Sequence, residues 1–154
     1  MADGHKLTLY GVHLKSNRGG ADSSRLRRER AVDYLFWDWK RRGLDPSVEY
    51  ILIMGDFNTS VLNPVFEKEQ TLRRLMKAGF KDAAEGLPVS ACFTVPTRPG
   101  GRFPPVDFDH ILVSSPLAHA LRDKPPWIKI LPTSSAISDH YPLFITIDTR
   151  SGSK

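Results

Sequence analysis

The sequence lacks the features that define several protein classes. Its 154 residues include a single cysteine, Cys92, which excludes an intrachain disulfide framework and a metal site built from several cysteines. No apolar run approaches the roughly 20 residues that a membrane-spanning helix needs, and residues 1–5 do not have the pattern of a signal peptide. We therefore expect a soluble protein with no membrane partner, cytoplasmic when expressed.

Composition is otherwise that of a folded domain with an excess of positive charge. Hydrophobic residues make up 40% of the chain, too many for a disordered protein. Lysine and arginine number 22 against 17 acidic residues, which leaves a net charge of +5. This charge favours polyanionic partners such as nucleic acid or phosphorylated ligands. Because no repeat or linker divides the chain, we expect one domain over residues 1–154.

Hydrophobic periodicity predicts an α/β chain. Strands are predicted over 6–14, 50–54, 91–95, 106–113, 127–131 and 143–148, and helices over about 24–42 and 63–78. The buried stripe of the first helix is expected to contain Val32, Leu35, Phe36 and Trp39. Gly43 is suited to end this helix, and Asn63 followed by Pro64 is suited to begin the second.

Several of these strands are apolar on both sides. Strands of this kind need a cover on each face of their sheet. Two helices can cover one face of a mixed five- to six-stranded sheet, and no further segment is evident in the sequence to cover the other. The sequence therefore predicts a sheet with two helices on one face and a bare apolar inner face.

Polar residues gather near the ends of four predicted strands, at 12–17 (VHLKSN), 55–58 (GDFN), 107–110 (DFDH) and 138–142 (SDHYP). Taken singly, each segment has an ordinary structural explanation as a strand end, a turn or a loop. Four such segments on one sheet are typical of a composite active site. Their carboxylates, carboxamides and histidines suit phosphodiester hydrolysis with a divalent ion, which needs oxygen ligands, a base and donors to phosphate.

The third and fourth segments carry particular expectations. Alternation along a strand places Asp107 and Asp109 on one face, with Phe108 and His110 on the other, so His110 is interpreted as structural. An aspartate inside an apolar strand requires a partner, either a metal or another cation. An Asp-His pair such as that at 139–140 can serve a metal ion and a proton transfer side by side.

At these four segments the sequence resembles the endonuclease/exonuclease/phosphatase superfamily, whose members share the deoxyribonuclease I-like fold. The order and spacing agree with that family over nearly the whole chain, and GDFN followed by SDHYP is the most specific signal. The resemblance implies a nuclease-like phosphodiester hydrolase that depends on Mg²⁺ or Mn²⁺.

The resemblance also implies catalytic roles for individual residues. His140 would be the general base or a histidine in contact with the phosphate, and Asp109 would hold its imidazole. Asp56 and Asn58 would orient the attacking water and bind the scissile phosphate. His13 would lie near the leaving group, as in the deoxyribonuclease-like branch of the family.

Metal and substrate contacts follow from the same resemblance. Asp139 and Asp56 would lie at the metal ion, while Asn58, Lys15 and Asn17 would bind substrate. Family members are commonly four-layer αββα sandwiches of two similar halves, and their first half supplies a metal-binding glutamate. No glutamate precedes His13 in this sequence.

The chain therefore resembles the C-terminal half of such a domain. We expect weak metal binding and weak or absent activity for this half alone. Two copies packed through the inner sheet face as a C2 homodimer could rebuild the four layers. Two alternatives remain open: a phosphatase for small or lipid phosphates, and a catalytically silent half-domain that associates with itself. The basic residues around 25–30 could follow a nucleic-acid backbone or could simply face solvent.

Overall fold

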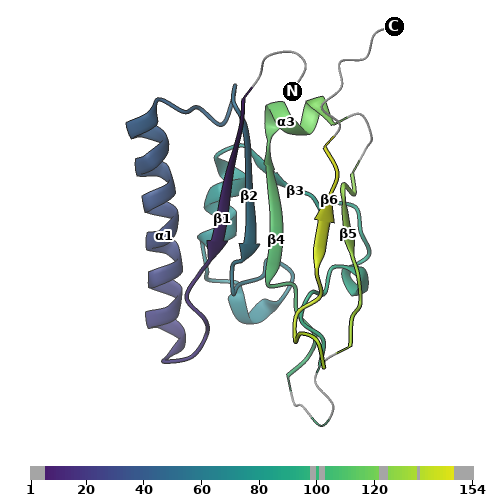
Figure 1. The fold of residues 1–154 in the computed structure, drawn as a ribbon. Helices are drawn as coiled ribbons and strands as arrows, with labels where there is room; N and C mark the ends of the chain where they lie inside the picture. The colour runs from purple at the N-terminus through teal and green to yellow at the C-terminus, as the bar shows by residue number, and fades with distance from the viewer. Residues whose placement is uncertain (1–5, 98–99, 101–102, 122–124, 135, 148–154) are drawn as a thin grey trace, which may run out of the picture.

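The computed structural model describes residues 6–97, 100, 103–121, 125–134 and 136–147. The first elements are β1 (Leu7–His13), α1 (Ala21–Arg42), β2 (Tyr50–Asp56), the 3-10 helix η1 (Pro64–Phe66), α2 (Thr71–Lys77) and β3 (Phe80–Asp82). They are followed by the 3-10 helix η2 (Val89–Ala91), β4 (Asp109–Ser114), α3 (Ser115–Ala120), β5 (Ile128–Ile130) and β6 (Leu143–Ile145) (Figure 1). This arrangement confirms the α/β class.

The main sheet contains four strands in the order β1-β2-β4-β3 (Figure 1). β1 and β2 are parallel and are connected through α1, whereas β4 is antiparallel to both β2 and β3. β5 and β6 form a separate antiparallel ribbon instead of extending this sheet. The expected five or six strands are thus divided, because β4 runs directly into α3, which carries the chain away from the main sheet before β5 begins.

One face of the main sheet is covered by α1 and α2. The core on this side includes Val32, Trp39, Ile51, Ile53, Leu72, Leu75, Phe80 and Leu112. Leu35 and Phe36 pack against it, so the predicted stripe of α1 is confirmed. Gly43 ends α1 as predicted, in a left-handed conformation with φ of 65°. No helix in the described ranges is both long enough and apolar enough to cross a membrane.

The opposite face is covered as well, which corrects the prediction of a bare inner face. α3 and the β5–β6 ribbon share a second core with the main sheet. This core contains Leu52, Ala83, Ile111, Val113, Leu117, Ala118 and Ile128. β5 and β6, which the sequence analysis placed in one large sheet, therefore help to cover the second face of the main sheet. Toward the β1 edge, apolar side chains of this face remain accessible, with Leu7 37% and Leu9 57% exposed.

The continuous helix predicted over 63–78 is wrong in its middle. Asn63 caps η1 as expected, its side-chain oxygen accepting a hydrogen bond of 3.0 Å from the Val65 N–H. The chain then leaves the helical conformation before α2 begins, and Glu69 in this break is buried against Arg28 of α1. Hydrophobic periodicity carries no information about an ion pair between two distant segments, so it could not predict the break.

The strand predicted over 91–95 is also absent from the sheet. Only Val95 makes an isolated bridge, and the following strand, β4, begins later than expected, at Asp109. The Thr94 hydroxyl accepts hydrogen bonds from the backbone N–H groups of Phe108 and Asp109 at 3.1 and 3.0 Å. A side chain thus satisfies amides that a neighbouring strand would otherwise satisfy.

Candidate active site

Three strands bring polar side chains together at one end of the main sheet. In the strand register, His13 of β1 lies opposite Asp56 of β2, and Asp56 lies opposite Asp109 of β4. Residues opposite one another on neighbouring strands project to the same face. Three of the four polar segments recognised in the sequence therefore contribute to one row of side chains.

The fourth segment reaches this row through His140, in the loop before β6. His140 Nδ1 lies 2.7 Å from Oδ2 of Asp109. Because a carboxylate only accepts hydrogen bonds, a neutral His140 ring carries its proton on Nδ1 and has its lone pair on Nε2. The family resemblance implies this contact, because it assigns Asp109 to hold the imidazole of His140.

Asp56 and Asn58 form a tight turn after β2. The Asn58 backbone N–H donates to Asp56 Oδ1 at 2.7 Å, and the Asn58 side-chain nitrogen donates to Oδ2 at 2.8 Å. Asn58 has a φ of 52°, in the left-handed region that asparagine tolerates better than most residues. Burial raises the pKa of Asp56; the Asn58 backbone hydrogen bond opposes this rise, and the charge of Asp109 adds to it.

Gly55, which precedes Asp56, permits β1 and β2 to approach closely beside the site. Its φ is 138°, and a Cβ atom at this position would lie 1.9 Å from the carbonyl oxygen of Val12. A larger residue would therefore require β1 to move. The glycine of the GDFN segment has a packing function that is separate from the chemistry of its neighbours.

The first polar segment contributes both to the row and to its support. His13 Nε2 lies 3.6 Å from Asp56 Oδ2, and the His13 side chain is 79% exposed. Lys15 Nζ donates to two carbonyl oxygens of its own loop, at 2.6 and 3.0 Å. Asn17 donates from its side-chain nitrogen to the backbone carbonyl of Asn58 at 3.0 Å. Asn17 therefore touches the backbone that carries the Asp56 turn.

Asp56, Asp109 and His140 form a group that could hold a metal ion. Each offers one ligand atom, and these atoms lie within 4.8 Å of one another. Two facing carboxylates fit a divalent cation, which would offset the repulsion that helps to raise the pKa of Asp56. Asp139, the other predicted metal ligand, lies exposed in the loop and is not a member of this group, so its role stays a prediction.

The remaining polar residues of the third segment support the fold. Asp107, for which the sequence predicts a metal or cation partner, instead accepts a hydrogen bond from the Ser60 hydroxyl. Burial raises the pKa of Asp107, and the Ser60 hydrogen bond opposes that rise. His110 takes the other face of β4, as predicted, with Nδ1 2.8 Å from Asp82 Oδ2 and Nε2 3.1 Å from the Thr59 carbonyl oxygen.

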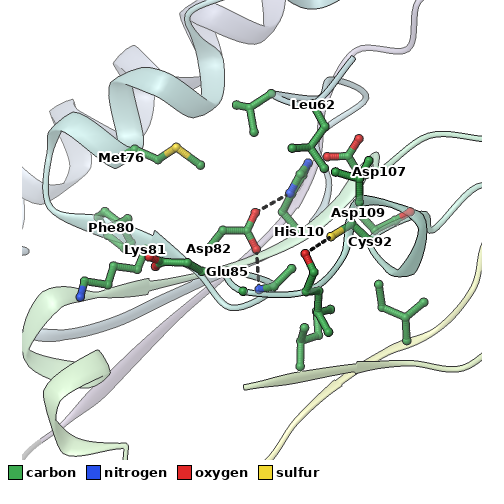
Figure 2. A pocket seen from close by; sticks show the side chains of 17 residues that line it. Leu62, Met76, Phe80, Lys81, Asp82, Glu85, Cys92, Asp107, Asp109 and His110 are labelled. Carbon is green, nitrogen blue, oxygen red and sulfur yellow. Dashed lines mark hydrogen bonds and ion pairs between the residues drawn. The ribbon is translucent and has the colours of Figure 1, made fainter. Parts of the chain in front are cut away.

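A cavity of about 470 Å³ borders the row of site residues on the side of His110 (Figure 2). Figure 2 shows Asp82 and His110 directed toward each other along its wall, which Asp109 also lines. Burial alone would lower the pKa of His110, but the hydrogen bond and charge of Asp82 raise it above its ordinary value. Much of the remaining wall is apolar and includes Leu62, Met76, Phe80 and Ile128.

A model of the endonuclease/exonuclease/phosphatase family matches residues 4–140 of this chain. The chain belongs to this family. No curated protein sequence matches it significantly. The family match includes the whole row of site residues and ends at His140.

Solved structures with the family fold resemble the chain at low sequence identity. The 3' phosphatase NExo from Neisseria has a TM-score of 0.63 and 18% identity, with 91% of this chain and 60% of NExo covered. A humanized D. rerio TDP2 has a TM-score of 0.61 and 19% identity, with 96% and 57% covered. Beta toxin from Staphylococcus aureus has a TM-score of 0.58 and 20% identity, with 93% and 53% covered. The chain thus has the fold of these proteins and spans about 60% of their length or less.

The sequence analysis did not predict the burial of two residues, Arg28 and Glu69. Arg28, assigned with its neighbours to a basic face of α1, is 1% exposed and forms two hydrogen bonds with Glu69. It also donates to Asn17 Oδ1 at 3.0 Å. Helical spacing offered a signal for Arg28, because it lies one turn before Val32 on the buried stripe. No comparable signal marks Glu69.

Proposed function

We propose that the chain is a divalent-metal-dependent phosphodiester hydrolase of the nuclease type. The observation that carries this proposal is the 2.7 Å contact between His140 Nδ1 and Asp109 Oδ2, beside Asp56, in a member of the endonuclease/exonuclease/phosphatase family. An imidazole held by a carboxylate at one nitrogen is arranged to exchange a proton at the other.

In the proposed reaction, water attacks the phosphorus atom of a phosphodiester. The new oxygen–phosphorus bond forms as the bond between phosphorus and the leaving oxygen breaks. His140 Nε2 takes the proton of the attacking water, with Asp109 stabilising the imidazolium that results. The leaving oxygen takes a proton from His13 in its protonated form. The position of His13 supports this role, because its side chain lies beside Asp56 in the row and is 79% exposed, so a leaving group can reach it.

A divalent cation is part of the proposal. Mg²⁺ or Mn²⁺ would be held by Asp56, with Asp139 as the further ligand that the family resemblance implies. When bound, the ion would supply positive charge to the phosphate. The facing carboxylates of Asp56 and Asp109 support such a site, because they concentrate negative charge where Asp56 is half-buried.

Nucleic acid is the proposed substrate class. Asn58, Lys15 and Asn17 would contact its phosphate groups, and the net charge of +5 favours a polyanion. NExo, which shares the fold, is described in complex with a product DNA hairpin. Since the chain covers 53–60% of NExo, the D. rerio TDP2 and beta toxin, we propose weak turnover for the 154-residue chain alone.

A phosphatase is the second candidate within the same chemistry. NExo is described as a 3' phosphatase, so the family fold also accommodates a phosphate monoester. The third candidate is a catalytically silent half-domain that associates with itself. The three differ in what the purified chain hydrolyses.

Hydrolysis assays with Mg²⁺ and Mn²⁺ test the proposal, using plasmid DNA, bis(p-nitrophenyl) phosphate and a panel of phosphate monoesters. We expect weak metal-dependent cleavage of the diesters that falls by roughly 10²–10⁴-fold in His140→Ala. His119→Ala, at an exposed position in α3, serves as the matched control. Turnover of monoesters alone would favour the phosphatase, and no turnover of either class would favour the silent half-domain.

A further inference from the structure

A buried ion pair lies between α1 and the break that precedes α2. Arg28 is 1% exposed and Glu69 5% exposed. Arg28 Nε and Nη2 donate to the two carboxylate oxygens of Glu69 at 2.6 and 2.5 Å. The Thr71 hydroxyl donates to the same carboxylate at 2.7 Å. Both charged groups are therefore partnered in a place from which water is largely excluded.

Stability alone is a poor explanation for this pair. Taking two charges out of water has a desolvation cost that can exceed their attraction, and apolar residues of similar size are often at least as stabilising. What the guanidinium of Arg28 offers beyond charge is a rigid planar fork with donors in fixed directions. The partners of its remaining donors show which part of the structure the Arg28 guanidinium holds in place.

Those remaining donors face the loop that follows β1. Arg28 Nη1 donates to the backbone carbonyl of Lys15 at 2.8 Å and to Asn17 Oδ1 at 3.0 Å. Because arginine has no acceptor, this contact determines that the oxygen of the Asn17 amide faces Arg28. The amide nitrogen is thereby directed to the Asn58 carbonyl oxygen, 3.0 Å away.

Asn58 connects this contact to the row of site residues. Its backbone N–H and its side-chain nitrogen both donate to the Asp56 carboxylate. These hydrogen bonds also help to hold Asn58 in its left-handed conformation, with φ of 52°. Hydrogen bonds thus run without interruption from Glu69 through Arg28, Asn17 and Asn58 to Asp56.

We propose that Arg28 and Glu69 are positioning residues of the candidate active site: their ion pair holds Asn17 against the Asn58 carbonyl and so maintains the geometry of the Asp56–Asn58 turn. The inference rests on the proposed function, because this geometry affects catalysis only if the turn acts on a phosphate ester. A displacement of about 1 Å at reacting groups can reduce a rate by about 100-fold.

Arg28→Lys tests the proposal and Arg27→Lys is its matched control. Lysine keeps the positive charge beside Glu69 but lacks the fork that also reaches Asn17. Arg27, the preceding residue, is exposed on the same helix. For hydrolysis of bis(p-nitrophenyl) phosphate with Mn²⁺, we expect Arg28→Lys to lower kcat by roughly 10–100-fold with little change in KM. Arg27→Lys is expected to leave both parameters unchanged.

A double-mutant cycle with Asn17→Ala tests the route. If Arg28 acts through Asn17, Arg28→Lys lowers kcat much less in the Asn17→Ala background than in the wild type. Independent effects on kcat, multiplying in the double variant, would show that Arg28 does not act through Asn17 and would overturn the proposal.

Nuclear magnetic resonance supplies a readout that does not depend on activity. Arg28→Lys is expected to shift the Asn17 side-chain amide and Asn58 backbone amide resonances of the full 154-residue chain, and Arg27→Lys is expected to leave them in place. Glu69→Gln, nearly identical in shape, should cause shifts of the same kind and replaces Arg28→Lys if that variant fails to fold. Unchanged resonances would contradict the contact.

The outcomes separate this inference from the function on which it rests. An inactive wild type with the expected resonance shifts would defeat the proposed hydrolase and retain the contact network. An active wild type with a folded Arg28→Lys of unchanged kcat would defeat the positioning role alone. Failure of both Arg28→Lys and Glu69→Gln to fold would make the pair a requirement of folding and overturn positioning as its function.

Discussion

Asp109 connects the strand residues of the candidate site with His140 in the loop before β6. It lies opposite Asp56 in the sheet register, and its Oδ2 is 2.7 Å from His140 Nδ1. The same carboxylate therefore orients the imidazole and increases the negative charge beside Asp56. The family resemblance implied the first role, whereas the second depends on strand pairing that no local pattern specifies.

Asp109→Asn is expected to lower kcat for phosphodiester hydrolysis by roughly 10²–10⁴-fold while the protein remains folded. The asparagine amide can donate to His140 Nδ1, which would favour the tautomer that has no lone pair on Nε2. Steady-state kinetics at constant metal concentration measure the change. Asp22→Asn, at an exposed position in the first turn of α1, is the control. Equal kcat values for the wild type and Asp109→Asn would contradict the role of His140 as base.

At the scale of elements, prediction succeeded for features that depend only on residues close together in the sequence. The stripe of α1, its glycine stop and the Asn63 cap depend on residues a few positions apart, and all three are observed. The helix over 63–78 fails because Glu69 turns inward to Arg28, a residue far away in the sequence. Its apolar pattern is compatible with one continuous helix, but tertiary contact decides otherwise.

Gly55→Ala is expected to destabilise the pairing of β1 with β2. The new Cβ would lie 1.9 Å from the Val12 carbonyl oxygen, and the φ of 138° is itself unfavourable for alanine. We expect the free energy of unfolding to fall by more than about 1 kcal/mol, measured by urea denaturation.

Gly11→Ala in β1 is the matched control for this substitution, because a Cβ at Gly11 meets nothing within 4 Å. Its effect on the free energy of unfolding is expected to be small. Similar stabilities for the two variants would show that the close approach at Gly55 can relax without cost.

Asp38→Asn is expected to destabilise the contact between α1 and β1 in a pH-dependent manner. Arg41 and Tyr10 each donate to the Asp38 carboxylate at 2.8 Å, and these hydrogen bonds, that of Arg41 first, lower the pKa of Asp38. A lowered pKa in the folded state means that the ionised group stabilises the fold above its unfolded pKa. This contribution disappears as the pH falls through the folded value.

Thermal unfolding from pH 7 down to pH 2 measures this effect. The Tm of Asp38→Asn should lie below that of the wild type at pH 7, and the difference should shrink below about pH 4, where the unfolded carboxyl becomes protonated. Glu67→Gln, at an exposed position after η1, controls for the loss of a surface charge. A Tm difference that does not vary with pH would contradict the assignment to the Asp38 carboxylate.

For the molecule as a whole, the cover of the inner face changes the basis of the predicted homodimer. α3 and the β5–β6 ribbon bury the centre of that face, so a second copy is not needed there. Exposed apolar side chains of this face lie on β1, at Leu7 and Leu9. The homodimer stays a prediction, with the β1 edge as its proposed contact.

Sedimentation at several protein concentrations tests this prediction. We expect a dimer that Leu9→Lys shifts toward the monomer, because the substitution places a charge among the exposed apolar side chains of β1. Lys81→Ala, at an exposed position on the other edge strand, β3, is the control. A wild type that sediments as a monomer at every concentration would contradict self-association through this face.

The amino-acid sequence by itself determined the α/β class, the C-terminal end of α1 and the four polar segments by which the family is recognised. These features are encoded locally, in helical spacing, in capping residues and in short motifs. They are therefore readable before the chain is folded.

Only the tertiary structure decided which residues meet. Strand register set Asp56 between His13 and Asp109, and the turn of the chain after β4 sent β5 and β6 to the second face. Packing of α1 against the segment before α2 placed Arg28 in a buried hydrogen bond with Glu69. Each of these outcomes depends on contacts between segments distant in sequence, and such contacts are selected by packing the whole chain at once.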